Sequence, residues 1–228
     1  MGKATPCTWK DESICEECSL SEDLNCRYDD KLVSCFRSRH IPFRLLGFAV
    51  TGVASLAVNS IWPFLVFALV TVLNFTLIET WYLCRHCPFY SKDGRTLYCI
   101  TLKGLPRLWN YDPAPIRKPE QYAMMAVGGF IDLFPIVAGA FGVWVLISEG
   151  AGLTSIAFMI ALTLAMLIGS VYLGRFLADS YCAKCVNLSC VMNKVPKAIA
   201  YDYLRRNPSL LEIWQTYGYE WDEESTAE

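Results

Sequence analysis

The chain has 228 residues, of which 54% are hydrophobic and only 18% are charged, and its formal net charge is -2. This composition is too apolar for a soluble domain of that length, and the apolar residues come in long blocks rather than periodic stripes. An ordinary soluble domain is therefore excluded, and we expect no nucleic-acid partner.

The first 40 residues are polar and rich in cysteine, and they lack the basic and then apolar layout of a signal peptide. Four of their cysteines are spaced symmetrically about a central pair: Cys7, Cys15, Cys18 and Cys26. So short a polar stretch cannot bury a core large enough to fold unaided. A bound metal would add on the order of 10 kcal/mol to the stability of its folded form. We expect these four thiols to bind metal in a separate arm. A disordered cysteine-bearing tail is the alternative, and Cys35 has no assigned role.

Four apolar blocks follow this arm, at about residues 44–58, 62–83, 122–147 and 153–177. Spanning roughly 30 Å of hydrocarbon takes about 20 apolar residues, so the last three blocks qualify and the first is short by about one turn. Very short links join the first block to the second and the third to the fourth. Each pair therefore predicts a helical hairpin.

The positions of Lys and Arg predict the orientation of these hairpins. The two short links carry none of these residues, whereas the other three segments carry nearly all of them. By the positive-inside rule, both termini and the connector between the hairpins should face the cytoplasm. We expect a multi-pass protein of the cell (plasma) membrane, in contact with lipid, in five parts: a cysteine-rich arm (1–40), hairpin 1 (41–83), a cysteine-rich connector (84–120), hairpin 2 (121–181) and a cysteine-rich tail with short helices (182–228).

The regions after the two hairpins share one pattern. Each hairpin is followed by Cys-x-x-Cys, then a third cysteine, then Pro-basic-x-x-x-Tyr-Asp. The first copy carries Cys84, Cys87 and Cys99, and the second carries Cys182, Cys185 and Cys190. Because two spans separate the copies, both have the same membrane orientation, which predicts a parallel internal repeat. The predicted fold class is an all-α membrane protein of four transmembrane helices in two hairpins, with cytoplasmic metal-binding segments.

Three kinds of site suit these six thiols: tetrahedral zinc, an iron-sulfur cluster or a redox dithiol. Cytosolic reductants keep ordinary thiol pairs reduced, which disfavours a structural disulfide. Two Cys-x-x-Cys pairs would supply a zinc site, with Cys99, Cys190 or His86 left over. The Cys87-Pro88 dipeptide and the aromatic residues near it favour iron-sulfur, although neither common ferredoxin spacing is present. The cofactor stays undecided between an iron-sulfur cluster and zinc.

Asp132 lies about ten residues into the third block, where an ionised carboxylate is costly unless it is paired or protonated. Gly128, Gly129 and Pro135 near it predict a close helix crossing or a kink. Arg175 in the fourth block is the partner that the sequence suggests, although its side chain could equally extend to the membrane interface. Asp132 and Arg175 are therefore a candidate intramembrane proton or quinone site, or an ion pair that fixes helix register.

The tail contains signals for two short helices. Pro196 can start the first, the Asn207-Pro208 pair ends it, and Ser209 with Glu212 fits a capping box for the second. The chain has no Walker loop, dinucleotide fingerprint or serine nucleophile elbow. The sequence therefore assigns no catalytic residue.

The stretches CRHCPFYSKDGRTLYC and CAKCVNLSCVMNKVPK, with WNYDPAPI between them, resemble a family of cysteine-rich four-span membrane proteins from anaerobic prokaryotes. The resemblance covers most of the chain. It implies a four-span fold and brings no activity, substrate or ligand.

Two functions stay open at this point. With iron-sulfur centres, the protein would be an electron-transfer or membrane-anchor subunit, partnered by a soluble redox protein or by other complex subunits. With zinc, it would be a membrane scaffold or binding module without a redox role. A membrane thiol-disulfide oxidoreductase is an outside alternative. Proteins of that class also have four spans and Cys-x-x-Cys pairs, but their pairs act on the extracytoplasmic side, opposite to the side predicted here.

Overall fold

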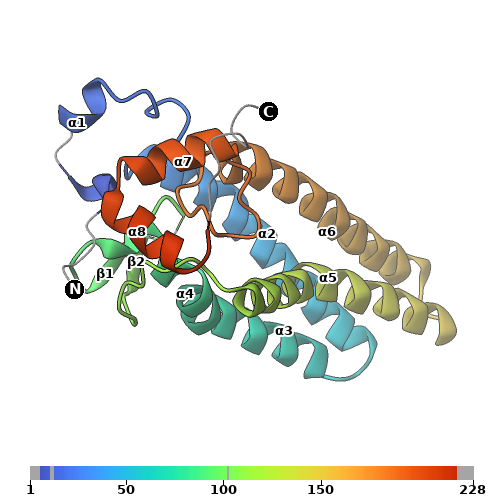
Figure 1. Cartoon of the computed structure of the whole chain (residues 1–228). Helices are drawn as coiled ribbons and strands as arrows, with labels where there is room; N and C mark the ends of the chain where they lie inside the picture. Colours follow the sequence, from blue (N-terminus) through green and yellow to red (C-terminus); the bar gives the residue numbers. More distant parts are fainter. Residues whose placement is uncertain (1–5, 11–12, 102, 220–228) are drawn as a thin grey trace. The chain divides into compact units, whose positions relative to one another are not determined.

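The computed structural model describes residues 6–10, 13–101 and 103–219. It divides into two compact units: unit 1 is drawn from residues 1–36, 79–121 and 176–228, and unit 2 from residues 37–78 and 122–175. The chain is mostly helical (Figure 1). In order, the elements are the 3-10 turn η1 (Cys7–Trp9), α1 (Ser13–Glu16), α2 (Asp30–Ala57), α3 (Trp62–Leu73), the π-helical turn η2 (Asn74–Ile78), α4 (Glu79–Tyr82), the 3-10 turns η3 (Cys84–His86) and η4 (Pro88–Ser91), β1 (Thr96–Tyr98), β2 (Lys103–Pro106), α5 (Lys118–Ser148), α6 (Leu153–Ser180), the 3-10 turn η5 (Cys182–Lys184), α7 (Lys197–Arg205) and α8 (Pro208–Thr216).

Four helical stretches are long and apolar enough to cross a membrane, as judged by length and composition: Asp30–Ala57, Trp62–His86, Lys118–Ser148 and Leu153–Lys184. The prediction of four membrane-length helices is therefore confirmed. The first helix is longer than expected, because α2 starts at Asp30 and continues through Pro42 into the apolar block. Hydropathy alone missed this start because the first turns of α2 are polar.

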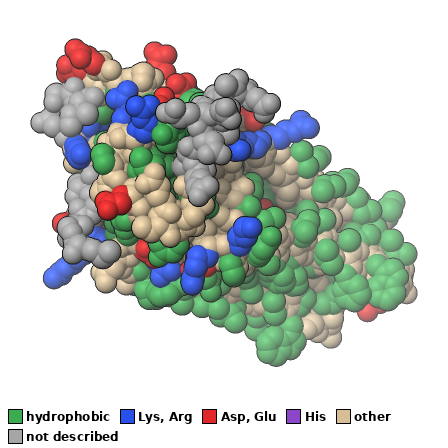
Figure 2. Space-filling model, in the orientation of Figure 1, with side chains coloured by type: hydrophobic (Ala, Val, Ile, Leu, Met, Phe, Trp, Pro, Cys, Tyr) green, Lys and Arg blue, Asp and Glu red, His purple; other side chains and the backbone are tan. Residues whose placement is uncertain are grey.

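In unit 2, aromatic and small side chains bring the helices together. Phe67 of α3 is fully buried, and its ring lies 5.0 Å from that of Phe48 in α2 and 6.4 Å from that of Phe134 in α5. A Cβ on Gly47 of α2 would lie only 2.9 Å from the Phe67 ring, so the glycine permits this approach. Such close packing is what holds helices together in lipid. The face of unit 2 seen in Figure 2 presents mainly hydrophobic side chains, as membrane helices require.

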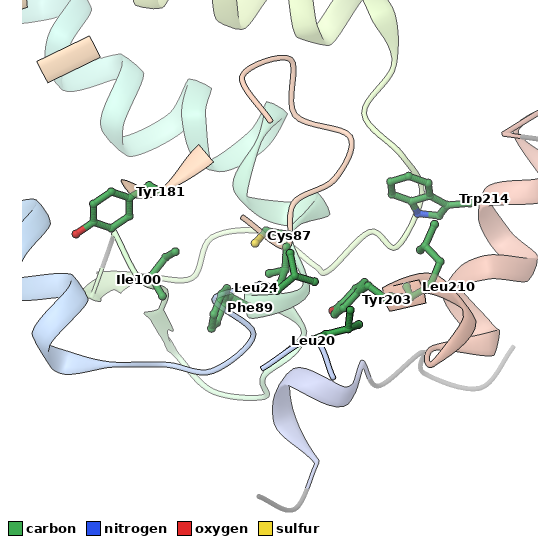
Figure 3. Packing of buried hydrophobic residues seen from close by; sticks show 11 residues of the cluster. Leu20, Leu24, Cys87, Phe89, Ile100, Tyr181, Tyr203, Leu210 and Trp214 are labelled. Carbon is green, nitrogen blue, oxygen red and sulfur yellow. The ribbon is translucent and has the colours of Figure 1, made fainter. Parts of the chain in front are cut away.

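Unit 1 is organised around one hydrophobic cluster to which all three of its chain segments contribute (Figure 3). Its buried members are Leu20, Leu24, Cys87, Phe89, Ile100, Tyr181, Val186, Tyr203, Leu204, Leu210 and Trp214. Burial of apolar surface at about 25 cal/mol per Å² is the main stabilising contribution to such a cluster. The N-terminal region, which is too polar to form a core alone, therefore shares a core with the connector and the tail.

The connector contains a small antiparallel sheet that the sequence did not predict. Thr96 of β1 lies opposite Pro106 of β2, and Tyr98 lies opposite Lys103. Cys99 follows β1 directly, in the segment that joins the two strands. Strands of three and four residues are too short to give a readable alternation of apolar and polar residues.

The tail forms the two expected helices, α7 and α8, but the predicted capping box is wrong. Helix α8 begins at Pro208, so Asn207 rather than Ser209 occupies the N-cap position, and no side chain caps the helix. Proline at the first helical position has no N–H to satisfy, which explains the earlier start.

Gly139 of α5 gives the first test of this packing. A Cβ at this position would contact Thr163 Oγ1 of α6 and would lie 3.0 Å from Val50 Cγ1 of α2. The Thr163 hydroxyl is held in place because it donates to the carbonyl of Met159 at 2.8 Å. Gly139→Leu should therefore reduce stability by about 1–3 kcal/mol and lower the midpoint of thermal unfolding in detergent. Gly174→Leu is the control, because an added Cβ there meets nothing within 4 Å; equal destabilisation by both changes would contradict the packing.

Candidate metal centre

The structure brings the six thiols of the two Cys-x-x-Cys segments into one region of unit 1. Burial raises the pKa of the Cys87 thiol well above its ordinary value, and the neighbouring Cys99 thiolate raises it further. Cys185 and Cys84 act in the same direction. The pKa of Cys87 therefore responds to thiols of both segments.

The second segment has the same character. Burial and the Cys190 thiolate raise the pKa of Cys185, and Cys99 and Cys182 add to the shift. Burial, Cys182 and the carboxylate of Glu79 raise the pKa of Cys190 to about 11. The ionisation of each of these six thiols is thus coupled to that of others, and together they are here called the six-thiol set.

Backbone N–H groups are directed at three of these sulfurs. The Phe89 N–H donates to Cys87 Sγ and partly offsets the rise in its pKa. The Asn187 N–H does the same for Cys185 Sγ. The Met192 N–H acts in the same way on Cys190 Sγ. Hydrogen bonds of this kind favour the ionised thiol, which is the form that binds metal.

The two Cys-x-x-Cys loops have the same local backbone conformation. Each opens with a 3-10 turn, preceded by Leu83 at φ -115° and ψ -56° in one loop and by Tyr181 at φ -119° and ψ -52° in the other. Their closing cysteines also agree, with φ -79° and ψ 135° at Cys87 and φ -83° and ψ 127° at Cys185. This agreement is local, and a repeat of the complete halves stays a prediction.

Two residues that the sequence did not single out connect the second loop to other parts of unit 1. Asn187 Nδ2 donates to the carbonyl of Leu83 at 3.1 Å, which ties the second loop to the start of the first. Ser189 Oγ accepts the Ile116 N–H at 3.1 Å, and its carbonyl accepts Gln121 Nε2 at 2.8 Å. In the sequence, Asn187 and Ser189 stand out only as two polar residues between Cys185 and Cys190. Such residues are equally typical of an ordinary turn, so their contacts could not be predicted.

His86 is not placed as a metal ligand. It is buried, its Nδ1 lies 2.8 Å from the carbonyl of Ala114, and its Nε2 accepts Arg85 Nε at 3.0 Å. Both ring nitrogens are therefore engaged, with the proton on Nδ1. Arg85 also pairs with the buried Glu120 at 3.3 Å, and its guanidinium lies 4.0 Å from the centroid of the Trp81 ring. These contacts stabilise the first Cys-x-x-Cys loop and leave His86 no free nitrogen for a cation.

The N-terminal thiols form a second group, here called the four-thiol set. Burial and the nearby Cys7 thiolate raise the pKa of the Cys26 thiol to about 12. Cys18 and Cys15 act in the same direction, whereas Arg27 lowers the pKa. Arg27 Nε also donates to Cys15 Sγ at 3.1 Å. The four cysteines that sequence spacing grouped are therefore neighbours in the structure.

Asn207 anchors this second group. Its Oδ1 accepts the Cys7 N–H at 2.7 Å, and its Nδ2 donates to the Tyr203 carbonyl at 2.8 Å and lies 3.4 Å from Cys7 Sγ. Burial, Cys7 and Tyr111 all raise the pKa of Tyr203, and burial and Cys87 raise that of Tyr111. Two tyrosines thus connect the four-thiol set electrostatically to the six-thiol set. In the sequence, the Asn-Pro pair indicated only a helix break.

Neither set is arranged as a finished metal site. Within residues 6–10, 13–101 and 103–219, no group of three or more His, Cys, Asp or Glu side chains is placed to hold a metal ion. No disulfide joins cysteines in that same part of the chain. The thiols nevertheless lie close enough to oppose one another's ionisation, and a metal cation would remove that repulsion. The donor chemistry therefore fits a thiolate-bound metal.

Asp132 of unit 2 pairs with Arg44 rather than with the expected Arg175. Arg44 Nη1 lies 2.7 Å from Asp132 Oδ1, and Arg44 Nε donates to His40 Nε2 at 3.1 Å. Arg175 is exposed on α6. Arg44 escaped sequence reasoning because it stands at the edge of the first apolar block.

No family model, curated protein or solved structure matches the chain. The function is therefore inferred from the residues of this chain alone.

Asn187 offers a test of the link between the two loops. Asn187→Ala removes its bond to Leu83 and leaves a partly buried carbonyl without this donor, which should cost about 1–3 kcal/mol in the free energy of unfolding. Denaturant or thermal unfolding followed by circular dichroism measures the loss. Asn110→Ala, at an exposed position, should change stability little, and a similar loss in both variants would refute the link.

Proposed function

We propose that this protein is an integral membrane metalloprotein in which the six-thiol set holds one shared metal centre, and that the centre is an iron-sulfur cluster. The observation that carries the proposal is the hydrogen bond of 3.1 Å from Asn187 Nδ2, in the second segment, to the Leu83 carbonyl just before the first. In agreement with it, the pKa of Cys185 responds to Cys99 and that of Cys87 responds to Cys185. Two independent sites would leave each set of three thiols to itself. A shared site uses thiolates from both.

The surroundings of the thiols favour iron-sulfur over zinc. Phe89, Ile100 and Val186 are buried in the same cluster as Cys87, and such an apolar shell limits water access and tunes the potential of a cluster. The N–H groups directed at the sulfurs stabilise thiolate charge. When bound, an iron-sulfur cluster supplies one-electron transfer, which suits a subunit that carries or anchors a redox partner.

The four-thiol set would hold a second metal whose role is to fix the N-terminal region to the tail. Arg27 and Asn207 already position Cys15 and Cys7. Four thiolates match a structural zinc site. In this proposal Tyr203 and Tyr111, which interact with the two sets, lie on the route between the centres.

The second candidate is a zinc-bound scaffold without a redox role. It is favoured by the way unit 1 unites three distant chain segments in one core, which is what a structural metal commonly stabilises. The thiol-disulfide alternative has less support, because burial raises the pKa of Cys87 and Cys185, whereas catalytic thiols have lowered pKa values.

We place the protein in the plasma membrane with both termini and the thiols on the cytoplasmic side. The support is the absence of Lys and Arg from the two short links and their abundance elsewhere. A soluble redox protein or other subunits of a complex would then reach the metal from the cytoplasm.

Metal content separates the candidates. Protein purified without oxygen should be brown, should contain iron and inorganic sulfide, and should bleach with dithionite. Cys87→Ser and Cys185→Ser should each remove the whole centre, because one site draws on both segments. Cys35→Ser is the control and should keep the metal.

Two outcomes would contradict the proposal of one shared iron-sulfur centre. A colourless anaerobic preparation with stoichiometric zinc would exclude the electron-transfer role in favour of the scaffold. Loss of half the metal in each serine variant would instead indicate two independent sites.

The orientation is tested by labelling introduced cysteines on intact cells. Glu149 lies in the link between α5 and α6, and Asp202 lies in α7; both are exposed. Glu149→Cys should react with a membrane-impermeant maleimide, whereas Asp202→Cys should react only after the membrane is permeabilised. The opposite result would place the thiols outside and restore the disulfide-forming alternative.

A further inference from the structure

Unit 2 carries its positive charge at one end. Its segments contain four arginines, of which three lie between residues 37 and 44 of α2, and the fourth is Arg175 near the end of α6. The same segments contain two carboxylates: Asp132 pairs with Arg44, and Glu149 lies in the link that precedes α6. That link is roughly 30 Å from Arg175, at 1.5 Å for each residue of the helix. The end of unit 2 that holds the arginines therefore has an excess of positive charge.

Two of these arginines approach each other from different helices. Arg39 Nε of α2 donates to the Tyr172 hydroxyl of α6 at 3.2 Å. Tyr172 is three residues before Arg175, so these two side chains are neighbours on the surface of α6. The helices also pack closely one turn away, where a Cβ on Gly169 would lie 3.1 Å from the ring of Phe43. Arg39 and Arg175 therefore lie on the same part of the surface of unit 2.

The two guanidinium groups suit a shared anion. Arg175 is exposed, and its side chain makes no hydrogen bond or ion pair with any residue that the structure describes. Neighbouring like charges repel each other, and an anion between them would remove that repulsion. The planar fork of N–H donors on a guanidinium matches the oxygens of a phosphate.

An apolar stripe on α6 leads up to Arg175. Leu164, Ile168 and Val171 follow one another at intervals of four and three residues, and their side chains are 50%, 67% and 52% exposed. Arg175 is four residues beyond Val171, so all four lie on one face of the helix. In a membrane-length helix such a face lies against acyl chains, and the arginine near its end extends to the headgroup level. This face thus offers an apolar surface beside a cationic group.

We propose that Arg39 and Arg175 together bind the phosphate of one anionic phospholipid, whose acyl chain lies along this stripe. Tyr172 is a positioning residue, because its hydroxyl holds Arg39 towards α6. Basic sites between membrane helices commonly bind anionic headgroups. A soluble acidic partner would account for the arginines but not for the apolar stripe, whereas a phospholipid fits both. The site lies wholly in unit 2 and does not depend on the identity of the metal.

The test uses purified full-length protein in detergent, with dioleoyl phosphatidylglycerol as the probe. Dioleoyl phosphatidylcholine is the reference, because it has the same acyl chains and no net charge. Phosphatidylglycerol should stay bound in native mass spectrometry and should raise the midpoint of thermal unfolding more than the reference does. Arg39→Gln and Arg175→Gln should each weaken its binding at least about tenfold, since each removes a charge-assisted contact. The double variant should lose less than the product of the two single losses, because both contacts serve one phosphate.

Three controls separate this site from diffuse attraction. Arg37→Gln removes the same charge from an exposed position on α2, about 200° around the helix from Arg39, and should weaken binding less than about threefold. Tyr172→Phe keeps the ring but frees Arg39, and its effect should lie between those of Arg37→Gln and Arg175→Gln. Inorganic phosphate should not raise the midpoint of unfolding, because it lacks the acyl chain.

Four outcomes would overturn the proposal. The first two are equal affinity for the two lipids and an equal loss of binding in Arg37→Gln and Arg175→Gln. The third is stabilisation by inorganic phosphate as strong as that by phosphatidylglycerol, which would leave the stripe without a role. The fourth is a dimer that Arg175→Gln dissociates while lipid binding is unchanged, which would assign this face to a second copy.

Discussion

The burial of cysteine thiols in a shared hydrophobic cluster is the constraint on which unit 1 depends. Cys87 lies in a hydrophobic cluster and has sulfur neighbours from both Cys-x-x-Cys segments, so its ionised form is unfavourable without a compensating cation. The N–H groups of Phe89 and Asn187 lower the pKa values of Cys87 and Cys185 and so partly offset the effect of burial. The proposed centre thus follows from a conflict between burial and charge that the protein alone resolves only in part.

Unit 2 presents a similar conflict with a different solution. Asp132 and Arg44 neutralise each other in a setting where either charge alone would be very costly, and the rings of Phe43 and Phe75 hold the guanidinium. The thiols of unit 1 and the polar pair of unit 2 are both assembled from segments that are far apart in the chain.

Sequence reasoning succeeded where a pattern is local and failed where partners are distant. Spacing grouped Cys7 with Cys26, and in the structure the Cys7 thiolate raises the pKa of Cys26; their role as metal ligands stays a prediction. Asn207, which holds Cys7 across 200 residues of chain, gave no local signal beyond a helix break. For the same reason Arg175 was the wrong partner for Asp132, since helix packing rather than hydropathy decides which arginine it meets.

The sequence by itself determined four membrane-length helices and the grouping of the cysteines, because hydrophobic length and ligand spacing are properties of short stretches of chain. Only the tertiary structure decided that both Cys-x-x-Cys segments share one set of thiols, that the N-terminal region packs into the same core, and that Arg44 faces Asp132. Those arrangements depend on contacts between residues far apart in the chain. Such contacts are selected by packing and by the satisfaction of buried polar groups, which no single segment encodes.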